Sequence, residues 1–292
     1  MKISVVVPTH NRAGLIRATL DSILAQETPP EELIVVDDGS TDDTQAVLHT
    51  YQSRIRTIRV ENGGAALARN TGLRAASGRL VAFCDSDDLW CPGFLTAMAS
   101  LWDRVPDLTT AYGNFRAFRD DVWARGSVFE RAPPGFWEGL RIVGPGLGIF
   151  DQPIVGRLIG AGLSVYQPFY PSAMVVERTA FLNAGGWEEL EPAEDYSTFL
   201  RAAERPIGIV QHALVGYRRH STNYSAVSYG WNDGLRHTVN RRVIIHARIL
   251  AHVVATRPAL KPHRQGFLAK IGERRVGKEC KSQCRSRWSP HH

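Results

Sequence analysis

The first 90 residues of the chain alternate four times between a short apolar run and a segment with the spacing of a helix. The apolar runs comprise residues 3–7, 33–36, 55–60 and 80–84, and they are rich in Val, Ile and Leu. The first of them, residues 3–7, is a β-branched run typical of a strand that is buried within a parallel sheet. Because parallel strands need helical crossovers, the alternation predicts an α/β fold, a doubly wound, mixed but mostly parallel sheet flanked by helices.

Beyond residue 90 the periodicity is weaker. Residues 124–170 are rich in Gly, Pro and aromatic residues, and we expect a variable, acceptor-side region there. Helices are expected at residues 92–102, 196–203 and 233–256, and strands at residues 109–118, 173–176 and 207–217.

Polar segments follow directly after three of the apolar runs, where each predicted strand ends. The carboxyl ends of parallel strands meet at one edge of a sheet, and α/β proteins bind ligands there. We therefore expect one site that is built from three segments, Pro8-Thr9-His10-Asn11-Arg12, Asp37-Asp38 and Asp85-Ser86-Asp87-Asp88.

Asp85, Asp87 and Asp88 place three carboxylates beside one another after the fourth run. Clustered carboxylates repel, so they remain ionised together only where a cation or hydrogen-bond donors compensate them. Oxygen ligands suit Mg²⁺ or Mn²⁺, which usually keep substrate phosphates in their coordination shell. The Asp-x-Asp pattern thus predicts a metal site for a diphosphate, with a solvated, helix-capping turn as the alternative.

The other polar segments suit a nucleotide. Pro8 fixes the direction of the chain, Thr9 can present backbone groups to a flat base, and Arg12 can pair with a phosphate. An aspartate at the place of Asp38 can accept a hydrogen bond from a base N–H or a ribose hydroxyl. The alternatives are a surface arginine in the first turn of a helix, and a plain turn that caps the next helix.

A helix with small residues is expected after Gly63-Gly64, over residues 65–76. Its Arg69 and Asn70 are expected to orient the nucleotide or to brace the aspartates. A purely structural role for both side chains is an equal alternative.

Taken together, these segments resemble those of the inverting glycosyltransferases of family 2, which have the nucleotide-sugar-binding GT-A fold. The resemblance covers residues 3–120 strongly and extends more thinly to residue 220. It implies that Asp38 contacts the uracil and that Asp85 and Asp87 contact the metal and the ribose. The nucleotide-sugar site would comprise Pro8, Thr9, Asn11, Arg12, Asp38, Arg69, Asn70, Asp85 and Ser86, with Mn²⁺ or Mg²⁺ as the cofactor.

The resemblance also directs attention to Glu194-Asp195, which follows Gly185-Gly186-Trp187. In the family such a pair opens a helix at the acceptor face, and Asp195 matches the catalytic base. Direct displacement at an anomeric carbon needs a carboxylate that takes the proton of the acceptor hydroxyl. The alternative is that both carboxylates only cap a helix and favour its N-terminus.

Tyr217-Arg218-Arg219-His220 resembles a Tyr-Arg-x-His segment of the same family. His220 is expected to be a metal ligand beside Asp85 and Asp87, or to contact a phosphate. A structural histidine is an equal alternative.

These residues predict an inverting, metal-dependent enzyme of glycan or polysaccharide biosynthesis. It would transfer a sugar from a UDP-sugar to a hydroxyl of a saccharide or lipid-linked saccharide. A sugar nucleotidyltransferase is one alternative, but it would have a Gly-rich loop with a basic residue after the first strand. A nucleotide-sugar-binding protein without turnover is the other, and the intact Asp85, Asp87 and Asp195 count against it.

The net charge of +6 does not indicate a nucleic-acid partner, because it is concentrated at one end of the chain. Residues 271–292 contain six Lys or Arg and two Glu, so they supply +4 of the +6. No apolar run is long enough for a transmembrane helix, and no secretory signal is evident. Because Cys84, Cys91, Cys280 and Cys284 do not form a disulfide framework, a cytoplasmic protein is expected, with peripheral association at the inner face of a membrane.

The chain is expected to divide into a GT-A domain, residues 1–220, and a helical C-terminal segment, residues 221–270. Within the domain, residues 1–120 would bind the nucleotide sugar and residues 121–220 the acceptor. The basic tail, residues 271–292, resembles a translated sequencing adapter and is expected to be non-native. A natural basic tail is the alternative.

Overall fold

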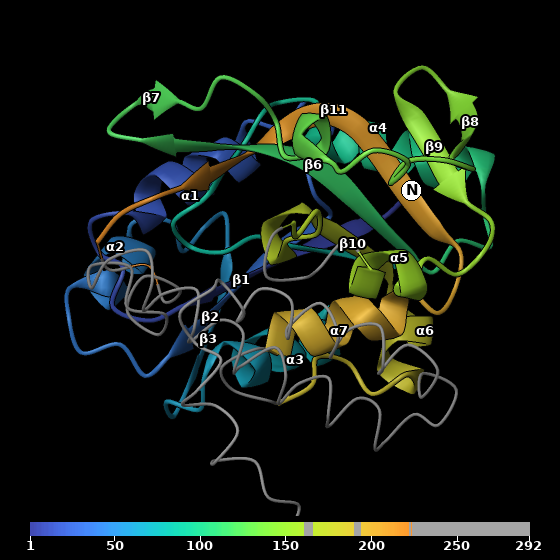
Figure 1. Cartoon of the computed structure of the whole chain (residues 1–292). Coiled ribbons are helices and arrows are strands. Elements are labelled where there is room, and N and C mark those ends of the chain that lie inside the picture. Colours follow the sequence, from blue (N-terminus) through green and yellow to red (C-terminus); the bar gives the residue numbers. More distant parts are fainter. Residues whose placement is uncertain (161–165, 190–193, 222, 224–292) are drawn as a thin grey trace, which may run out of the picture.

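The computed structural model describes residues 1–160, 166–189, 194–221 and 223 of the chain (Figure 1). The strands of this part belong to one 11-stranded sheet. Its first half is parallel in the order β3-β2-β1-β4, formed by β1 (Ile3–Thr9), β2 (Glu32–Asp38), β3 (Arg56–Val60) and β4 (Leu80–Phe83). These are the four apolar runs of the sequence, so the predicted parallel arrangement is confirmed.

The second half of the sheet is mixed. β10 (Met174–Glu177) runs antiparallel between β4 and β6 (Thr110–Arg119), and β11 (Ile207–Arg218) is parallel to β6. β9 (Leu147–Phe150) and β8 (Arg141–Gly144) continue the sheet as an antiparallel hairpin. Two short strands pair outside this order, β5 (Leu89–Trp90) with β11 and β7 (Val122–Trp123) with β6.

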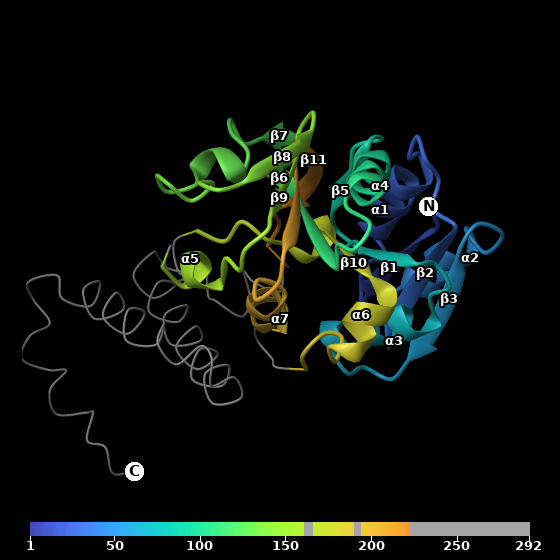
Figure 2. The same cartoon turned by 90° about the vertical axis from the view of Figure 1, so that its right-hand side faces the viewer.

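Helices cover both faces of the sheet. In Figure 2, strands β1, β2 and β10 lie between α1 and α4 on one side and α3 and α6 on the other. The first group comprises α1 (Ile16–Leu24), α2 (Thr44–His49) and α4 (Phe94–Arg104). The second comprises α3 (Ala65–Ala75), α6 (Arg178–Asn183) and α7 (Glu194–Ala202), with α5 (Val155–Gly160) in contact with α7.

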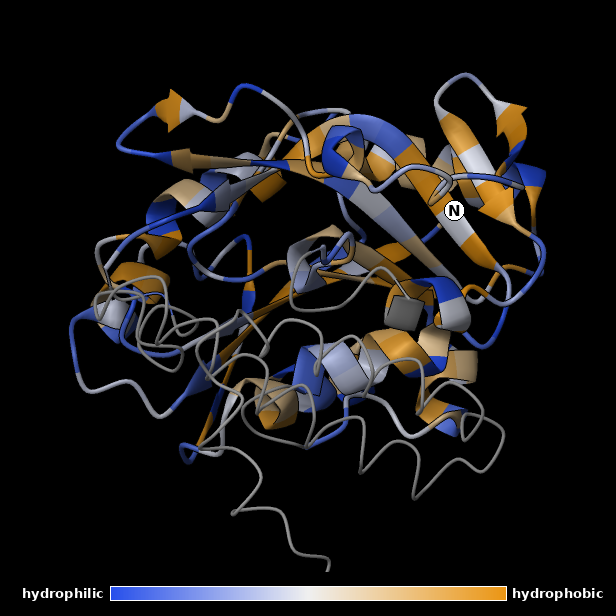
Figure 3. Ribbon diagram, in the orientation of Figure 1, coloured by the Kyte–Doolittle hydropathy of each residue, from blue (hydrophilic) through white to orange (hydrophobic). Residues whose placement is uncertain are grey.

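Two hydrophobic clusters fill the space between the sheet and these two groups of helices. Neighbouring residues of one strand point to opposite faces, so Val6 packs with α3 while Val5 and Val7 pack with α1. All three side chains are fully buried, and each such burial contributes about 1.5–3 kcal/mol. Figure 3 accordingly shows the central strands as mainly hydrophobic and the connecting loops as mainly hydrophilic.

The small residues of α3 let this helix approach the sheet closely. A Cβ atom at Gly72 would lie 2.3 Å from Cγ1 of Val6 on β1, so no larger residue fits there without a shift of the helix. Close approach matters for the site, because α3 carries Arg69 and Asn70 toward the ends of the strands.

Within the described residues, the other elements that the periodicity predicts are also present. The strands near residues 109–118, 173–176 and 207–217 correspond to β6, β10 and β11. Within residues 124–170, however, the β8–β9 hairpin and α5 were not predicted. The hairpin is short, and it joins the sheet through the pairing of β9 with β11, which lies far away in sequence.

The predicted C-terminal elements lie outside the described residues. This applies to residues 224–270, including the expected helix at 233–256, and to the tail at 271–292, so the domain boundary stays a prediction. Among the residues that the structure does describe, no helix has both the length and the hydropathy needed to span a bilayer.

Candidate active site

Three strands of the parallel half end at the same edge of the sheet. β1 ends at Thr9, whose register partner on β2 is Asp37. β4 ends at Phe83, paired with the β1 strand at Val6, and leads directly to Asp85. The polar segments that follow β1, β2 and β4 therefore meet at one edge, as the order of the elements predicts.

Asp38 is buried at the end of β2 and fixes the start of α3. Its two carboxylate oxygens accept hydrogen bonds from the backbone N–H groups of Gly63 and Gly64, each at 2.9 Å. Gly64 has a φ of +90°, a conformation that residues with a side chain rarely adopt. A carboxylate has further acceptor positions, so contact of Asp38 with a base stays a prediction that this geometry permits.

The loop after β1 is tied to the loop after β2 by Asn11. Its side-chain oxygen accepts hydrogen bonds from the backbone N–H groups of Thr41 at 2.8 Å and Asp42 at 3.3 Å. Asn11 therefore has a structural role here, and its contact with a nucleotide stays a prediction. Pro8 lies within β1, and the neighbouring Thr9 has a buried hydroxyl without a hydrogen-bond partner in the described part of the chain.

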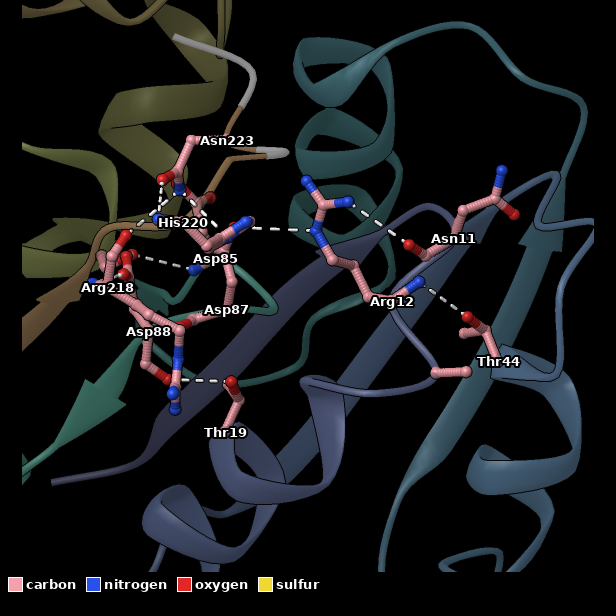
Figure 4. Close-up of polar contacts among 12 residues, drawn as sticks. Asn11, Arg12, Thr19, Thr44, Asp85, Asp87, Asp88, Arg218, His220 and Asn223 are labelled. Atoms are coloured by element: carbon pink, nitrogen blue, oxygen red, sulfur yellow. Dashed lines mark hydrogen bonds and ion pairs between the residues drawn. The ribbon is translucent and has the colours of Figure 1, made fainter. Parts of the chain in front are cut away.

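Arg12 extends from the same loop toward the acidic cluster (Figure 4). Its backbone N–H donates to Oγ1 of Thr44 at 2.8 Å, which fixes the start of the side chain. The Nε atom lies 3.6 Å from Oδ2 of Asp87. Arg12 is therefore placed to neutralise Asp87 or an anionic ligand that approaches it.

Asp87 and His220 come together although they are far apart in sequence (Figure 4). Oδ2 of Asp87 lies 2.9 Å from Nε2 of His220, and Nε of Arg218 donates to the Asp87 carbonyl at 2.9 Å. Asn223 holds the histidine in place, because its Oδ1 accepts from the His220 backbone N–H at 2.6 Å. The segment after β11 thus closes one side of the acidic cluster.

Asp88, which follows Asp87 in the cluster, is fully buried. Its carboxylate accepts hydrogen bonds from Oγ of Ser172 at 2.5 Å and from the backbone N–H of Arg218 at 2.9 Å. Burial raises its pKa well above the ordinary value, and the charges of Asp87 and Asp85 add to this. Asp88 is therefore a structural member of the cluster that joins β4, β10 and β11.

Asp85 is held by its backbone and by its side chain. Its N–H donates to Oγ of Ser172 at 2.9 Å, and its Oδ1 accepts from a terminal nitrogen of Arg69 at 2.7 Å. The other terminal nitrogen of Arg69 donates to Oε1 of Glu194 at 3.4 Å. Ser86, between Asp85 and Asp87, is buried.

Glu194 and Asp195 form the first turn of α7, where Glu194 is buried and Asp195 is half-buried. Burial, followed by the neighbouring Asp195, raises the pKa of Glu194 to about 7. Burial also raises the pKa of Asp195, whereas the positive charge of Arg69 opposes the rise. A carboxylate whose pKa lies nearer to neutrality is a stronger base at physiological pH. Gln167 approaches Oδ2 of Asp195 at 3.5 Å.

Asn70 has a structural role, which was one of its two expected roles. Its amide accepts from the N–H of Trp187 at 2.8 Å and donates to the carbonyl of Trp187 at 2.9 Å. Gly186 has a φ of +66°, and a Cβ there would lie 2.5 Å from Oδ1 of Asn70. The glycine before Trp187 is therefore needed for this contact.

Three residues of the site were not found by sequence reasoning: Ser172, Gln167 and Arg218 in its bond to Asp87. Ser172 lies in the 3₁₀ turn at Pro171–Ala173 before β10, and neither its residue type nor its spacing marks it. Only the antiparallel placement of β10 beside β4 brings its hydroxyl to Asp85 and Asp88.

The sequence pattern described as Glycosyl transferase family 2 matches residues 4–152, just over half of the chain. The chain belongs to glycosyl transferase family 2. The matched range contains the three polar strand ends and the strands of the sheet other than β10 and β11.

A curated relative of this family 2 chain is UDP-Glc:alpha-D-GlcNAc-diphosphoundecaprenol beta-1,3-glucosyltransferase WfgD from Escherichia coli. The two are 38% identical over 121 residues, which are 41% of this chain and 47% of WfgD. The chain spans less than half the length of the first curated relatives that it matches.

Solved structures support the GT-A fold of this family 2 chain. S. aureus TarS 1–349 in complex with UDP-GlcNAc is similar with a TM-score of 0.62 and 21% identity, over 94% of this chain and 72% of TarS 1–349. The mannosyltransferase PcManGT from Pyrobaculum calidifontis, in complex with GDP-Man and Mn²⁺, is similar with a TM-score of 0.52 and 21% identity, over 95% of this chain and 88% of PcManGT.

Proposed function

We propose that the chain is an inverting glycosyltransferase that transfers a sugar from a UDP-sugar to a hydroxyl acceptor. One observation carries the proposal: the carboxylate pair that opens α7, Glu194 and the half-buried Asp195, is joined to Asp85 through the bond of Arg69 to Glu194, at the edge where α/β sheets bind ligands. The family and the fold support it, because family 2 is a family of glycosyl transferases.

The residues around Asp87 suit a divalent cation. Within the described ranges, no three His, Cys, Asp or Glu side chains form a ready metal cluster. Oδ2 of Asp87 and Nε2 of His220 nevertheless lie 2.9 Å apart, close to the roughly 3 Å that separates adjacent ligands around Mn²⁺ or Mg²⁺. Asp87, His220 and Asp85 would hold the ion, which when bound neutralises charge on the departing diphosphate.

The protein side chains divide the work of the reaction. Asp38 and Thr9 would contact the base, and Arg12, which lies beside Asp87, would contact the diphosphate. Asp195 takes the proton of the acceptor hydroxyl onto its carboxylate while the acceptor oxygen bonds to the anomeric carbon. The bond from that carbon to the diphosphate breaks on the opposite side, and UDP leaves with its electron pair. A single displacement of this kind inverts the anomeric configuration.

The acceptor is proposed to be a saccharide or a lipid-linked saccharide in glycan or polysaccharide biosynthesis. The support is the match to WfgD, whose name describes transfer to a diphosphoundecaprenol-linked GlcNAc. UDP is proposed because the name of WfgD includes UDP-Glc and the TarS structure contains UDP-GlcNAc. Since the PcManGT structure contains GDP-Man, GDP-sugars should be tested alongside UDP-sugars.

The test is release of nucleoside diphosphate from a panel of UDP- and GDP-sugars with Mn²⁺, Mg²⁺ or a chelator. We expect release of UDP from at least one UDP-sugar, and only when a cation is present. Asp87→Ala should abolish the cation-dependent part of UDP binding, measured by calorimetry, whereas a change of an exposed aspartate outside the acidic cluster, Asp107→Ala, should not. Tight UDP binding without release from any donor would favour a binding protein, and equal UDP affinity of Asp87→Ala would refute the metal assignment.

A further inference from the structure

Arg69 forms hydrogen bonds with a residue on the proposed donor side of the site, Asp85, and with one on the proposed acceptor side, Glu194. Asp85, which accepts from it at 2.7 Å, follows β4, whereas Glu194, which accepts at 3.4 Å, opens α7. The side chain of Arg69 is only 5% exposed, so solvent screens neither ion pair strongly. The two halves of the proposed reaction therefore share one buried cation.

The guanidinium group is also fixed across its face. Its central carbon lies 4.7 Å from the centre of the Trp187 ring, and Asn70 holds the backbone of Trp187 by two hydrogen bonds. A planar fork that is stacked on one ring and bonded at both terminal nitrogens has one favourable orientation. Residues 69 and 70 of α3 thus bind adjacent parts of the segment that leads to α7.

The charges around the α7 carboxylates show why this cation matters. Among the residues that the structure describes, the groups that face Asp195 are Arg69 from α3, Asp85 after β4, Gln167 before β10, and Glu194 and Tyr196 on α7 itself. Arg69 is the cation among these groups. Burial acts against its own charge, but Asp85 and Glu194 raise its pKa above the ordinary value, so it remains charged.

We propose that Arg69 is a positioning residue that couples donor binding to proton removal. Its guanidinium group binds both the Asp85 carboxylate and the first turn of α7, and so fixes their relative position. Its positive charge keeps Asp195 ionised and ready to accept the proton. This inference rests on the proposed transferase function. It assigns to Arg69 a task that is distinct from contact with the nucleotide, since both terminal nitrogens are already engaged by protein carboxylates.

Two substitutions separate the charge from the geometry of the fork. Arg69→Met removes the charge, so the pKa of the α7 carboxylates should rise, and the acidic limb of the pH–rate profile should move to higher pH by roughly one pH unit or more. Arg69→Lys keeps the charge but loses the planar fork, so the limb should stay while the plateau rate falls roughly 10- to 100-fold. Arg74→Met, an exposed arginine of the same helix, is the matched control and should change neither.

The assay is UDP release, as a function of pH and with saturating Mn²⁺, from the UDP-sugar that the donor panel identifies. The titration of Glu194, followed by carboxyl ¹³C NMR, provides a readout that does not depend on turnover, and Glu194→Gln assigns its signal. In the wild type this signal should titrate near pH 7, in Arg69→Met at higher pH, and in Arg69→Lys as in the wild type. If Arg69→Met does not fold, Arg69→Lys still tests the geometric half through its plateau rate.

The outcomes distinguish this inference from the proposed function. Release of UDP by the wild type, with the same acidic limb and plateau in all three variants, would overturn the role of Arg69 alone. No release from any donor by the wild type would overturn the proposed function, and an unchanged Glu194 titration in Arg69→Met would then overturn the coupling as well. The inference is supported if the acidic limb moves to higher pH in Arg69→Met, while Arg69→Lys keeps the wild-type limb and has a lower plateau rate.

Discussion

Replacement of Ser172 by Ala should destabilise the chain more than loss of an ordinary serine hydroxyl. The Ser172 hydroxyl donates to the fully buried Asp88 carboxylate at 2.5 Å and accepts from the N–H of Asp85 at 2.9 Å. A hydrogen bond to a charged group contributes about 1.5–3 kcal/mol, and an unsatisfied buried N–H costs about 1–3 kcal/mol. Because Asp88 keeps its bond from Arg218, we expect a loss of about 3 kcal/mol in the free energy of unfolding.

Ser22→Ala is the matched control for this change. Its hydroxyl also accepts from a backbone N–H, that of Trp90 at 3.1 Å, and donates to a carbonyl of Thr19 at 2.8 Å, but it meets no carboxylate. We expect a loss of about 1 kcal/mol there. Urea denaturation of both variants gives the comparison, and UDP binding reports whether Asp85 has moved. A Ser172→Ala variant that loses no more stability than Ser22→Ala would refute the argument that Ser172 supports the acidic cluster.

Two further changes probe the α7 side of the site. Glu194→Gln should flatten the pH dependence of stability. In the folded wild type the pKa of Glu194 is about 7 against an ordinary 4.5, so between these two pH values the folded protein holds a proton that the unfolded chain has lost. The free energy of unfolding of the wild type should therefore fall by about 3 kcal/mol as the pH rises from 4.5 to 7. Urea titrations at about pH 5 and about pH 8 measure this, and equal slopes in both proteins would contradict it. Gly186→Ala should cost roughly 2 kcal/mol, because of its φ of +66° and the contact at 2.5 Å with Oδ1 of Asn70. Gly14→Ala, where a Cβ meets nothing within 4 Å, is its control in thermal unfolding.

Much of the fold follows from local pattern. Three of the four apolar runs, those of β1, β2 and β4, are buried on both faces, whereas β3 is largely exposed. The segments between the runs form helices because their apolar residues recur at helical spacing. The convergence of Thr9, Asp38 and Asp85 then needs only the rule that parallel strands end at one edge. The second half is less predictable, since β10, β9 and β8 are short strands whose partners lie far away in sequence.

The division of labour within the site was less readable from the sequence. Asp88 and Asp87 are neighbours of one type in one motif, yet one is fully buried against Ser172 and the other faces His220. Asn11 binds the backbone of the next loop, although a polar residue at a strand end is equally typical of a ligand contact. Such roles depend on which segment packs opposite, and residue type alone does not encode this.

The central claim is that Asp195 removes the acceptor proton while other residues hold the donor. The direct measurement is a comparison of Asp195→Asn with the wild type, in UDP release from the donor that the panel identifies and in UDP affinity with Mn²⁺. We expect kcat to fall about 10²- to 10⁴-fold while the affinity for UDP stays within about threefold. A variant that keeps the wild-type kcat, or that loses UDP affinity in parallel with its rate, would contradict the account.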